Sequence, residues 1–366
     1  MKRDDSAGPP RSPVRRSRSR VSLPIPISYP PMEALSVEEI PRGEVWQYEP
    51  KWDGFRCLAF RDGGDVELQS KAGQPLARYF PEVVDFLRGL PAKRFVLDSE
   101  IVIPVGKEPS FDDLLQRIHP ADSRVRKLAA EQPALLIVFD LLVDASGSSL
   151  VDLPLARRRP LLEAFAGANF PAGGRVRLSP ATTELREARR WLSGVGGALD
   201  GIVAKRRDFT YAEGSGERTG MQKVKLLRTA DCVVGGFRYA SKGKVVGSLL
   251  LGLYDDEGRL DHVGFCSGLT GKAREELTPQ LEALVKPPGF TGNAPGGPSR
   301  WSTERSGDWK PLAPKLVAEV QYDHFTGGRF RHGTRLMRWR PDKAPRQCTM
   351  DQVARRRRKS PLELLA

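Results

Sequence analysis

Residues 49–56 read Glu-Pro-Lys-Trp-Asp-Gly-Phe-Arg, and this stretch decides how the rest of the chain is interpreted. Lys51 stands two residues before the carboxylate of Asp53, and Gly54 then permits a tight turn. Lysine, aspartate and glycine are also common in surface turns, so these residues alone predict little. Their meaning depends on the motifs that follow.

Several short polar motifs follow in order along the chain. They are Ser70-Lys71-Ala72-Gly73, Asp98-Ser99-Glu100, Phe139-Asp140-Leu141-Leu142, Asp200-Gly201-Ile202-Val203-Ala204-Lys205, Lys223-Val224-Lys225 and Arg340-Pro341-Asp342-Lys343. Together with residues 49–56, they resemble the ordered motifs of the covalent nucleotidyltransferase superfamily of DNA ligases, RNA ligases and mRNA capping enzymes. Within it, residues 110–120 and 330–345 look most like the stand-alone bacterial ATP-dependent DNA ligases of the C type, relatives of the ligase module in bacterial end-joining enzymes.

This resemblance implies a fold and an activity. The expected fold class is α+β, with a nucleotidyltransferase domain of ATP-grasp-like antiparallel sheets and helices followed by an all-β oligonucleotide-binding (OB) barrel. The expected activity seals 3′-hydroxyl/5′-phosphate nicks in duplex DNA, through AMP bound covalently to Lys51 and then a DNA-adenylate. ATP would be the nucleotide, and Mg²⁺ or Mn²⁺ the metal.

Matching positions in the motifs imply the roles of residues around the nucleoside. Lys51 would be the nucleophile, and Glu49 would recognise the adenine amino group. Arg56 and Glu100 would hold the ribose, and Phe139 would stack on the base.

The same matching implies roles at the phosphates. Lys205 would contact the α-phosphate, and Lys71 would help to bind phosphate. Asp342 and Lys343 would orient pyrophosphate for departure when the barrel closes over ATP.

Carboxylates supply the expected metal ligands. Asp200, together with Glu100, would hold magnesium, a hard cation that favours carboxylate oxygen. Asp53 would assist at the metal or at the 3′-hydroxyl.

The chemistry itself explains the remaining lysines. Lys51 attacks phosphorus only as a neutral amine, and nearby cations or burial lower an amine pKa. Lys223 and Lys225 are the candidate cations, because residues two apart on a strand point the same way. They would also hold the triphosphate and offset charge on the transferring phosphoryl group.

Three positions depart from the commonest form of these motifs. Lys71 stands where arginine is usual, Asp200 where glutamate is usual, and Met221 where tryptophan is usual. Lysine binds phosphate as a point charge and not as a bidentate fork. Aspartate is one methylene shorter than glutamate, so we expect a different metal geometry.

Composition agrees with this interpretation. The 366 residues are 39% hydrophobic and 28% charged, which suits a globular chain of two domains. The formal charge of +14 favours a polyanionic partner such as nucleic acid.

The chain divides into four predicted parts. They are a disordered basic arm over 1–25, the adenylation domain over 26–229, the barrel over 230–350 and a basic tail over 351–366. The basic arm could serve as a solubilising tail or contact phosphate, and the basic tail would add non-specific attraction to DNA. We expect a hinge near residues 228–231, because the barrel must present different groups in different steps.

Periodicity and turn residues predict the main elements. In the first domain, strands are predicted over 56–60, 66–69, 95–102 and 134–142, and helices over 81–89, 111–118, 155–166 and 184–194. In the second, strands are predicted over 231–239, 247–254, 260–267 and 316–322, and a helix over 273–285.

The four cysteines form no CxxC pair, which supports neither a zinc site nor a disulfide framework and fits a reducing cytosol. No apolar run is long enough to span a bilayer or to form an export signal. We therefore expect a monomer in the bacterial cytoplasm, at the nucleoid. The resemblance suggests nicked duplex DNA and repair polymerases or end-joining proteins as partners.

Two other functions stay open. An RNA ligase or capping-type nucleotidyltransferase shares the lysine chemistry but uses another acceptor or nucleotide. A DNA-binding scaffold that retains an inactive ligase fold is the second, although the intact Lys51, Glu100, Lys223 and Lys225 argue against it. The sequence does not indicate whether a nick, a short gap or a cohesive end is preferred.

Overall fold

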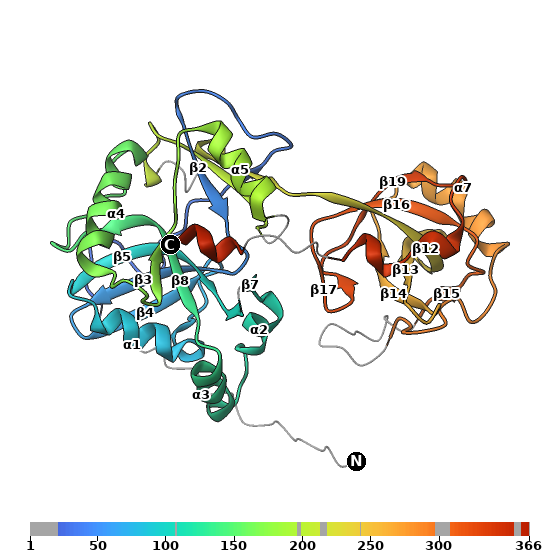
Figure 1. Ribbon diagram of the computed structural model, residues 1–366, viewed down its shortest axis with the longest axis horizontal. Helices are drawn as coiled ribbons and strands as arrows, with labels where there is room; N and C mark the ends of the chain where they lie inside the picture. The colour runs from blue at the N-terminus through green and yellow to red at the C-terminus, as the bar shows by residue number, and fades with distance from the viewer. Residues whose placement is uncertain are drawn as a thin grey trace, which may run out of the picture.

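The computed structural model describes residues 21–106, 108–195, 199–212, 218–241, 243–296, 308–354 and 360–365. Figure 1 shows two domains connected by an extended segment of chain. Both expected domain types are present, so the α+β class with an OB-type second domain is confirmed.

The central sheet of the N-terminal domain has the strand order β4-β3-β5-β8-β9, and only the β8/β9 pair is parallel. Its strands are β3 (Phe55–Asp62), β4 (Asp65–Ser70), β5 (Arg94–Val102), β8 (Leu135–Val143) and β9 (Val176–Leu178). Successive side chains of a strand face opposite sides. Cys57 and Ala59 accordingly belong to one core cluster, and Leu58 and Phe60 to another.

Helices cover one face of this sheet. The helices of this domain are α1 (Pro81–Gly89), α2 (Phe111–Gln116), α3 (Asp122–Glu131), α4 (Leu155–Asn169) and α5 (Leu185–Val195). Helix α5 lies beside the second sheet. Val83 and Leu87, one helical turn apart in α1, and Leu162 and Phe165 in α4 pack in the same cluster as Cys57. The opposite face is therefore left for the second sheet.

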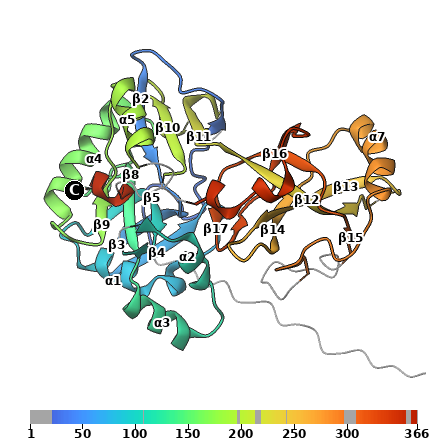
Figure 2. The same ribbon diagram turned by 45° about the vertical axis from the view of Figure 1, so that its right-hand side comes forward.

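The second sheet has the order β1-β11-β10-β2 and lies against that opposite face (Figure 2). Its strands are β1 (Leu35–Ser36), β2 (Trp46–Lys51), β10 (Gly201–Arg206) and β11 (Met221–Lys225). Tyr48 and Ile202 from this sheet share a buried cluster with Val102 and Ile137 of the central sheet. The motifs of the sequence thus converge between two sheets.

The OB domain is built on a sheet of order β14-β13-β12-β16-β19, with β15 also paired to β12. Its strands are β12 (Arg228–Tyr239), β13 (Val246–Tyr254), β14 (Leu260–Cys266), β15 (Lys310–Pro311), β16 (Val317–Tyr322) and β19 (Arg335–Trp339). Helix α7 (Gly271–Glu282) packs on this sheet, and a short hairpin of β17 (Phe325–Thr326) and β18 (Arg329–Phe330) follows β16. A further hairpin, β6 (Pro104–Val105) and β7 (Glu108–Pro109), belongs to the first domain.

The connection between the two domains is short. The expected hinge at residues 228–231 lies inside β12, where Arg228 pairs with Tyr322 and Thr229 with Gln321. Only Leu226 and Leu227 separate β11 from β12. Strand pairing extends to the junction because β16 provides a partner for the first residues of β12.

The ends of the chain also differ from the sequence prediction. Of the predicted basic arm, residues 1–20 lie outside the described part, but Ile25 is buried in the core. In the predicted basic tail, Val353 packs in the OB core, whereas Pro361–Leu365 forms a short 3₁₀ helix, η6, on the N-terminal domain. The apolar side chains of these segments bury themselves despite the neighbouring charges. No helix in the described part of the chain could cross a membrane.

Candidate active site

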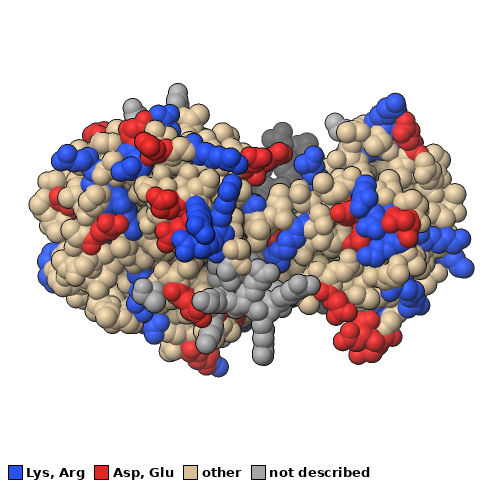
Figure 3. Space-filling view, turned by 45° about the horizontal axis from the view of Figure 1, so that its top comes forward, with Lys and Arg blue, Asp and Glu red and all other residues tan. Residues whose placement is uncertain are grey.

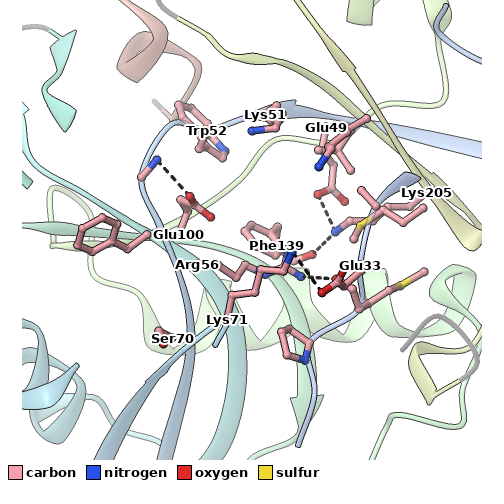
Figure 4. Close-up of a pocket in the computed structure, with 18 of the residues that line it drawn as sticks. Glu33, Glu49, Lys51, Trp52, Arg56, Ser70, Lys71, Glu100, Phe139 and Lys205 are labelled. Atoms are coloured by element: carbon pink, nitrogen blue, oxygen red, sulfur yellow. Dashed lines mark hydrogen bonds and ion pairs between the residues drawn. The ribbon is translucent and has the colours of Figure 1, made fainter. Parts of the chain in front are cut away.

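A cavity of about 510 Å³ opens between the two sheets of the N-terminal domain (Figure 4). Its volume lies within the usual range of small-molecule sites. Eight of the residues given a role from the sequence line it: Glu49, Lys51, Arg56, Lys71, Glu100, Phe139, Lys205 and Lys223. They come from both sheets and from the turn after β4, so neither sheet alone forms the site.

Lys51 is the last residue of β2, and its position is fixed by the neighbouring strand. It pairs in register with Gly201 of β10, and its carbonyl accepts a hydrogen bond from the backbone of Asp200. The Lys51 amine contacts the Asp200 carboxylate. Burial would raise the pKa of Asp200, but hydrogen bonds and charge from His324 and Lys51 lower it to about 2. Asp200 is therefore ionised at neutral pH and acts as the counter-ion of the lysine.

An aromatic ring flanked by two cations forms part of the cavity wall. The Arg56 guanidinium lies 4.8 Å from the centroid of the Phe139 ring, and the Lys205 amine lies 4.7 Å from it. Asp98 holds Arg56 through hydrogen bonds of 2.6 and 2.5 Å, and Glu49 holds Lys205 in a 2.8 Å ion pair. These groups offer an apolar surface with fixed polar atoms around it, which suits a nucleoside.

Glu100 lies opposite Arg56 in the β3/β5 ladder and accepts a 3.1 Å hydrogen bond from the backbone of Gly54. Burial raises the pKa of Glu100 to about 7, against the opposing charges of Lys51 and Arg56. Gly54 cannot be replaced by a larger residue, because a Cβ there would lie 2.1 Å from the carbonyl oxygen of Ile101. Glycine is therefore required at position 54 because the backbone of β5 approaches it closely.

The rim of the cavity carries several cations. Glu33 forms ion pairs with Lys71, at 3.2 Å, and with Arg218, at 2.8 Å. All three residues also line a second cavity of about 400 Å³ that adjoins the first. Burial lowers the pKa of Lys223, and the charges of Lys51, Lys71 and Lys225 lower it further. Such a concentration of positive charge suits a polyphosphate.

The OB domain contributes side chains to the carboxylates beside Lys51. Arg331 donates two hydrogen bonds, of 2.7 and 2.5 Å, to Asp53. The Nε2 atom of His324 lies 2.7 Å from Asp200. Asp53 and Asp200 are therefore each held by a residue from the other domain.

Lys223 and Lys225 lie on a strand, β11, as predicted, but their surroundings differ. Lys223 lines the cavity, whereas Lys225 forms a 2.8 Å hydrogen bond to Asp323 of the OB domain. In this arrangement of the domains Lys225 is thus paired with a carboxylate of the protein itself.

Asp342 and Lys343 do not line the cavity in this arrangement of the domains, and their role at pyrophosphate stays a prediction. Lys343 lies 2.6 Å from Asp231, and Arg340 binds both Asp231 and Asp342. These contacts all lie within the OB domain. They are remote from Lys51 because the OB domain presents His324 and Arg331 to the site.

The carboxylates assigned to a metal provide few ligands. Asp200 and Glu100 both interact with the charge of Lys51 and so flank the same amine. Among the described residues, no three His, Cys, Asp or Glu side chains group as a metal cage. Magnesium commonly binds through one or two carboxylates with phosphates and water. This donor set therefore fits a cation shared with a nucleotide.

Sequence analysis assigned no role to Glu33, Arg218, His324 or Arg331. Arg331 falls within residues 330–345, where the resemblance was noted, and His324 follows an acidic residue just after a predicted strand. A polar residue just after a predicted strand was the only available signal for His324. Glu33 and Arg218 lie outside every motif.

Comparison with known proteins gives matches across both domains. The chain matches a family model described as the ATP dependent DNA ligase domain over residues 31–225. It also matches one described as the ATP dependent DNA ligase C terminal region over residues 242–343.

Individual proteins are similar over nearly their whole length. DNA ligase C2 of Mycolicibacterium smegmatis is 43% identical over 350 residues, covering 91% of this chain and 96% of that protein. DNA ligase C of Mycobacterium tuberculosis is 41% identical over 350 residues, covering 92% and 96%. A solved structure from a study of Lig E DNA ligases has a TM-score of 0.51 at 16% identity, covering 84% of this chain and 99% of that one. At that identity the structural likeness concerns the fold alone.

Proposed function

The chain belongs to the ATP-dependent DNA ligase family, and from this premise we propose that it seals 3′-hydroxyl/5′-phosphate nicks in duplex DNA through AMP carried on Lys51. The observation that supports this role for Lys51 most directly is its position in the wall of a nucleotide-sized cavity that also contains Phe139 and a cationic rim. Each step below assigns a role to a residue of that cavity.

In the first step the Lys51 amine attacks the α-phosphorus of ATP. A phosphorus–nitrogen bond forms, the bond to the β-phosphate oxygen breaks, and pyrophosphate leaves. The amine must first lose its proton, because only a neutral amine is a nucleophile. Lys223, Lys225 and Lys205 would hold the phosphates and offset the charge on the transferring group.

The nucleoside would bind through the groups around Phe139. The adenine would stack on the Phe139 ring, and Glu49 would accept a hydrogen bond from the amino group of the base. Arg56 and Glu100, which lie opposite one another in the ladder, would hold the ribose.

A divalent magnesium or manganese ion held by Asp200 and Glu100 would act as a Lewis acid on the phosphoryl oxygens. Lys51 now neutralises Asp200, so its conversion to a phosphoramidate, whose nitrogen carries no positive charge, would free that carboxylate. Asp53 would assist at the ion or at the 3′-hydroxyl.

The OB domain would change its orientation between steps. Asp342 and Lys343 are assigned to pyrophosphate, yet within the OB domain Asp342 pairs with Arg340 and Lys343 with Asp231. We propose that the domain turns about Leu226 and Leu227 to bring them over ATP. The orientation in the structure, with Arg331 and His324 at the carboxylates, would serve the later steps.

On DNA, an oxygen of the 5′-phosphate would take AMP from Lys51, and the 3′-hydroxyl would then attack that phosphate and release AMP. Lys71, at the rim, would bind the 5′-phosphate. Lysine and arginine side chains lie on both domains, including near the waist between them (Figure 3), and the chain has a formal charge of +14. We infer that the protein acts in DNA repair at the nucleoid of a bacterial cytoplasm, as a monomer beside repair polymerases or end-joining proteins.

Labelling separates this proposal from its alternatives. The protein is incubated with magnesium and either ATP or GTP, and its intact mass and peptide map are recorded. We expect ATP to add one AMP at Lys51, and Lys51→Ala to remain unmodified. The adenylylated protein should then seal nicked DNA. Labelling by GTP or preferential sealing of nicked RNA would favour the related nucleotidyltransferases, and absence of any adduct would refute the proposed function.

A further inference from the structure

One residue of the OB domain is buried among the catalytic carboxylates of the other domain. His324 lies between β16 and β17, and only 4% of it is exposed. Its Nε2 atom is 2.7 Å from Oδ1 of Asp200, while the Lys51 amine contacts Oδ2 of the same carboxylate. The two oxygens of Asp200 are thus divided between two nitrogens from different domains.

The second ring nitrogen faces another carboxylate. Nδ1 of His324 lies 3.9 Å from Oδ2 of Asp53 and has no hydrogen-bond partner within the described residues. Asp53 is itself held by Arg331. The imidazole therefore stands between the carboxylates of Asp200 and Asp53.

The local fold fixes the backbone that carries this ring. The His324 amide donates a 2.7 Å hydrogen bond to Asp323, and its carbonyl accepts one of 3.1 Å from the Arg331 amide. Asp323 is in turn bound by Lys225 and His332. A buried side chain supported on both sides has a defined direction, which is what a positioning role requires.

From these contacts we propose that His324 is a positioning residue for the steps on DNA, which orients Asp200 only while the OB domain has the present orientation. This inference rests on the proposed function. In the structure His324 is at Asp200 while Lys343 is at Asp231. A rigid rotation that carries Lys343 to the nucleotide must withdraw His324 from the carboxylate.

The chemistry of Lys51 explains why Asp200 needs this partner after the first step. Once AMP is attached, the lysine nitrogen has lost its positive charge and can no longer neutralise Asp200. His324 then remains to fix the direction of a carboxylate with a short side chain. Before AMP is attached, Lys51 itself holds Asp200, so loss of His324 has little effect on that step.

The steps are measured separately in wild type, His324→Ala and His324→Gln. Transfer of AMP from ATP to Lys51 is followed by intact mass. Transfer from preformed enzyme-AMP to a nick, and closure of a chemically adenylated nick, are followed in single turnovers. We expect the alanine variant to label within about twofold of wild type but to fall roughly ten- to a hundredfold in the steps on DNA, as for loss of a hydrogen bond to a charged group. The glutamine variant, whose amide can replace Nε2–H, should recover much of this loss.

A spectroscopic readout tests the contact without turnover. The chain has four histidines, so imidazole nitrogen resonances can be assigned by single substitutions. We expect Asp200→Asn to shift the His324 ring resonances and to leave those of His119 unchanged. Lys272→Ala, at an exposed position of α7, is the matched control for the kinetic series.

Equal slowing of all three steps in His324→Ala, or wild-type rates in every step, would overturn the positioning role. His324 resonances that do not change in Asp200→Asn would also overturn it. If wild type itself gains no AMP, the proposed function fails. If wild type seals nicks and His324→Ala is equally active, only this inference fails and the proposed function stands.

Discussion

At the scale of single residues, Glu49 and Lys205 show how the site depends on buried charge. Their ion pair is 2.8 Å long, and 3% and 5% of the two side chains are exposed. Glu49 also accepts a 2.8 Å hydrogen bond from Gln47. A buried pair of this kind adds little net stability, but removing one partner leaves an uncompensated charge. The pair is therefore better explained by the nucleotide than by stability.

We predict that Lys205→Met lowers the free energy of unfolding by about 3–5 kcal/mol, because Glu49 is left charged and buried. The double variant Glu49→Gln/Lys205→Met should regain most of that loss in urea unfolding. Both variants should still show a raised KM for ATP in labelling of Lys51. A double variant with normal ATP labelling would contradict the nucleotide-binding roles.

Glu100 makes the stability of the nucleotide-free protein depend on pH. Its pKa rises from 4.5 to about 7, so the folded protein binds a proton there that the unfolded chain has lost. Stability from this group is therefore lost as pH rises from about 4.5 to 7. We predict that Glu100→Gln stabilises the protein relative to wild type by about 1–3 kcal/mol more at pH 8 than at pH 4.5, in urea unfolding. A difference independent of pH would contradict the assigned cause.

Whether a site residue could be identified from the sequence depends on how far along the chain its partner lies. Residues 49–56 and the later motifs were identifiable because each is a local pattern, and Lys51, Glu100 and Phe139 do line one cavity. The contact of His324 with Asp200 joins segments 124 residues apart, and nothing local in either segment indicates the other. Partners across domains required the structure.

At the scale of elements, β10 holds the proposed catalytic residues of β2 and β11 in register. Gly201 pairs with both Lys51 and Lys225, and its φ of 150° lies in the region that favours glycine. A Cβ at this position would lie 1.9 Å from the carbonyl oxygen of Val224. Any side chain must therefore push β11 away from β10.

We predict that Gly201→Ala destabilises the protein by at least about 1–3 kcal/mol and lowers Lys51 labelling at least tenfold, since it displaces Asp200 and Lys225 together. Gly167→Ala is the matched control, because a Cβ in this part of α4 meets no atom within 4 Å. That change should be neutral or stabilise the helix by up to about 1 kcal/mol. Thermal unfolding and AMP labelling measure both, and normal labelling of Gly201→Ala would count against the register argument.

Elements were predictable where one face alone was apolar. Helix α1 has proline at its first position and buried Val83 and Leu87 one turn apart, and its predicted bounds agree with the structure. Helix α3 was missed because it buries only Val125 and Ala129 among charged residues. Strand β2 was missed because it packs against both the central sheet and α5, so its residues show no alternation in burial.

At the scale of the whole molecule, the chain leaves the OB domain and returns to the first domain. Figures 1 and 2 show the last short helix, η6, beside the central sheet and away from the other C-terminal elements. Its leucines pack against the cluster of Trp46, Tyr48 and Trp52, the last of which directly follows Lys51. The two domains are thus joined at Leu226–Leu227 and again through η6.

The second connection limits how far the OB domain can move. Ala354 is the last described residue in the OB domain and Ser360 the first beyond it, so six residue steps separate them. An extended chain of that length spans at most about 20–22 Å. While η6 stays bound, Ala354 cannot move farther than this from Ser360. A larger rotation requires η6 to be released.

We predict that Leu362→Asp/Leu364→Asp releases η6, lowers the free energy of unfolding by about 1–3 kcal/mol and widens the range of distances between the domains. Dyes on cysteines introduced at exposed Lys127 and Lys272 report that distance by single-molecule energy transfer, and the four native cysteines are buried. Glu363→Ala, on the exposed side of the same helix, should leave the distribution unchanged. If the double variant also matches wild type, η6 does not restrain the OB domain, and Leu226–Leu227 alone governs its movement.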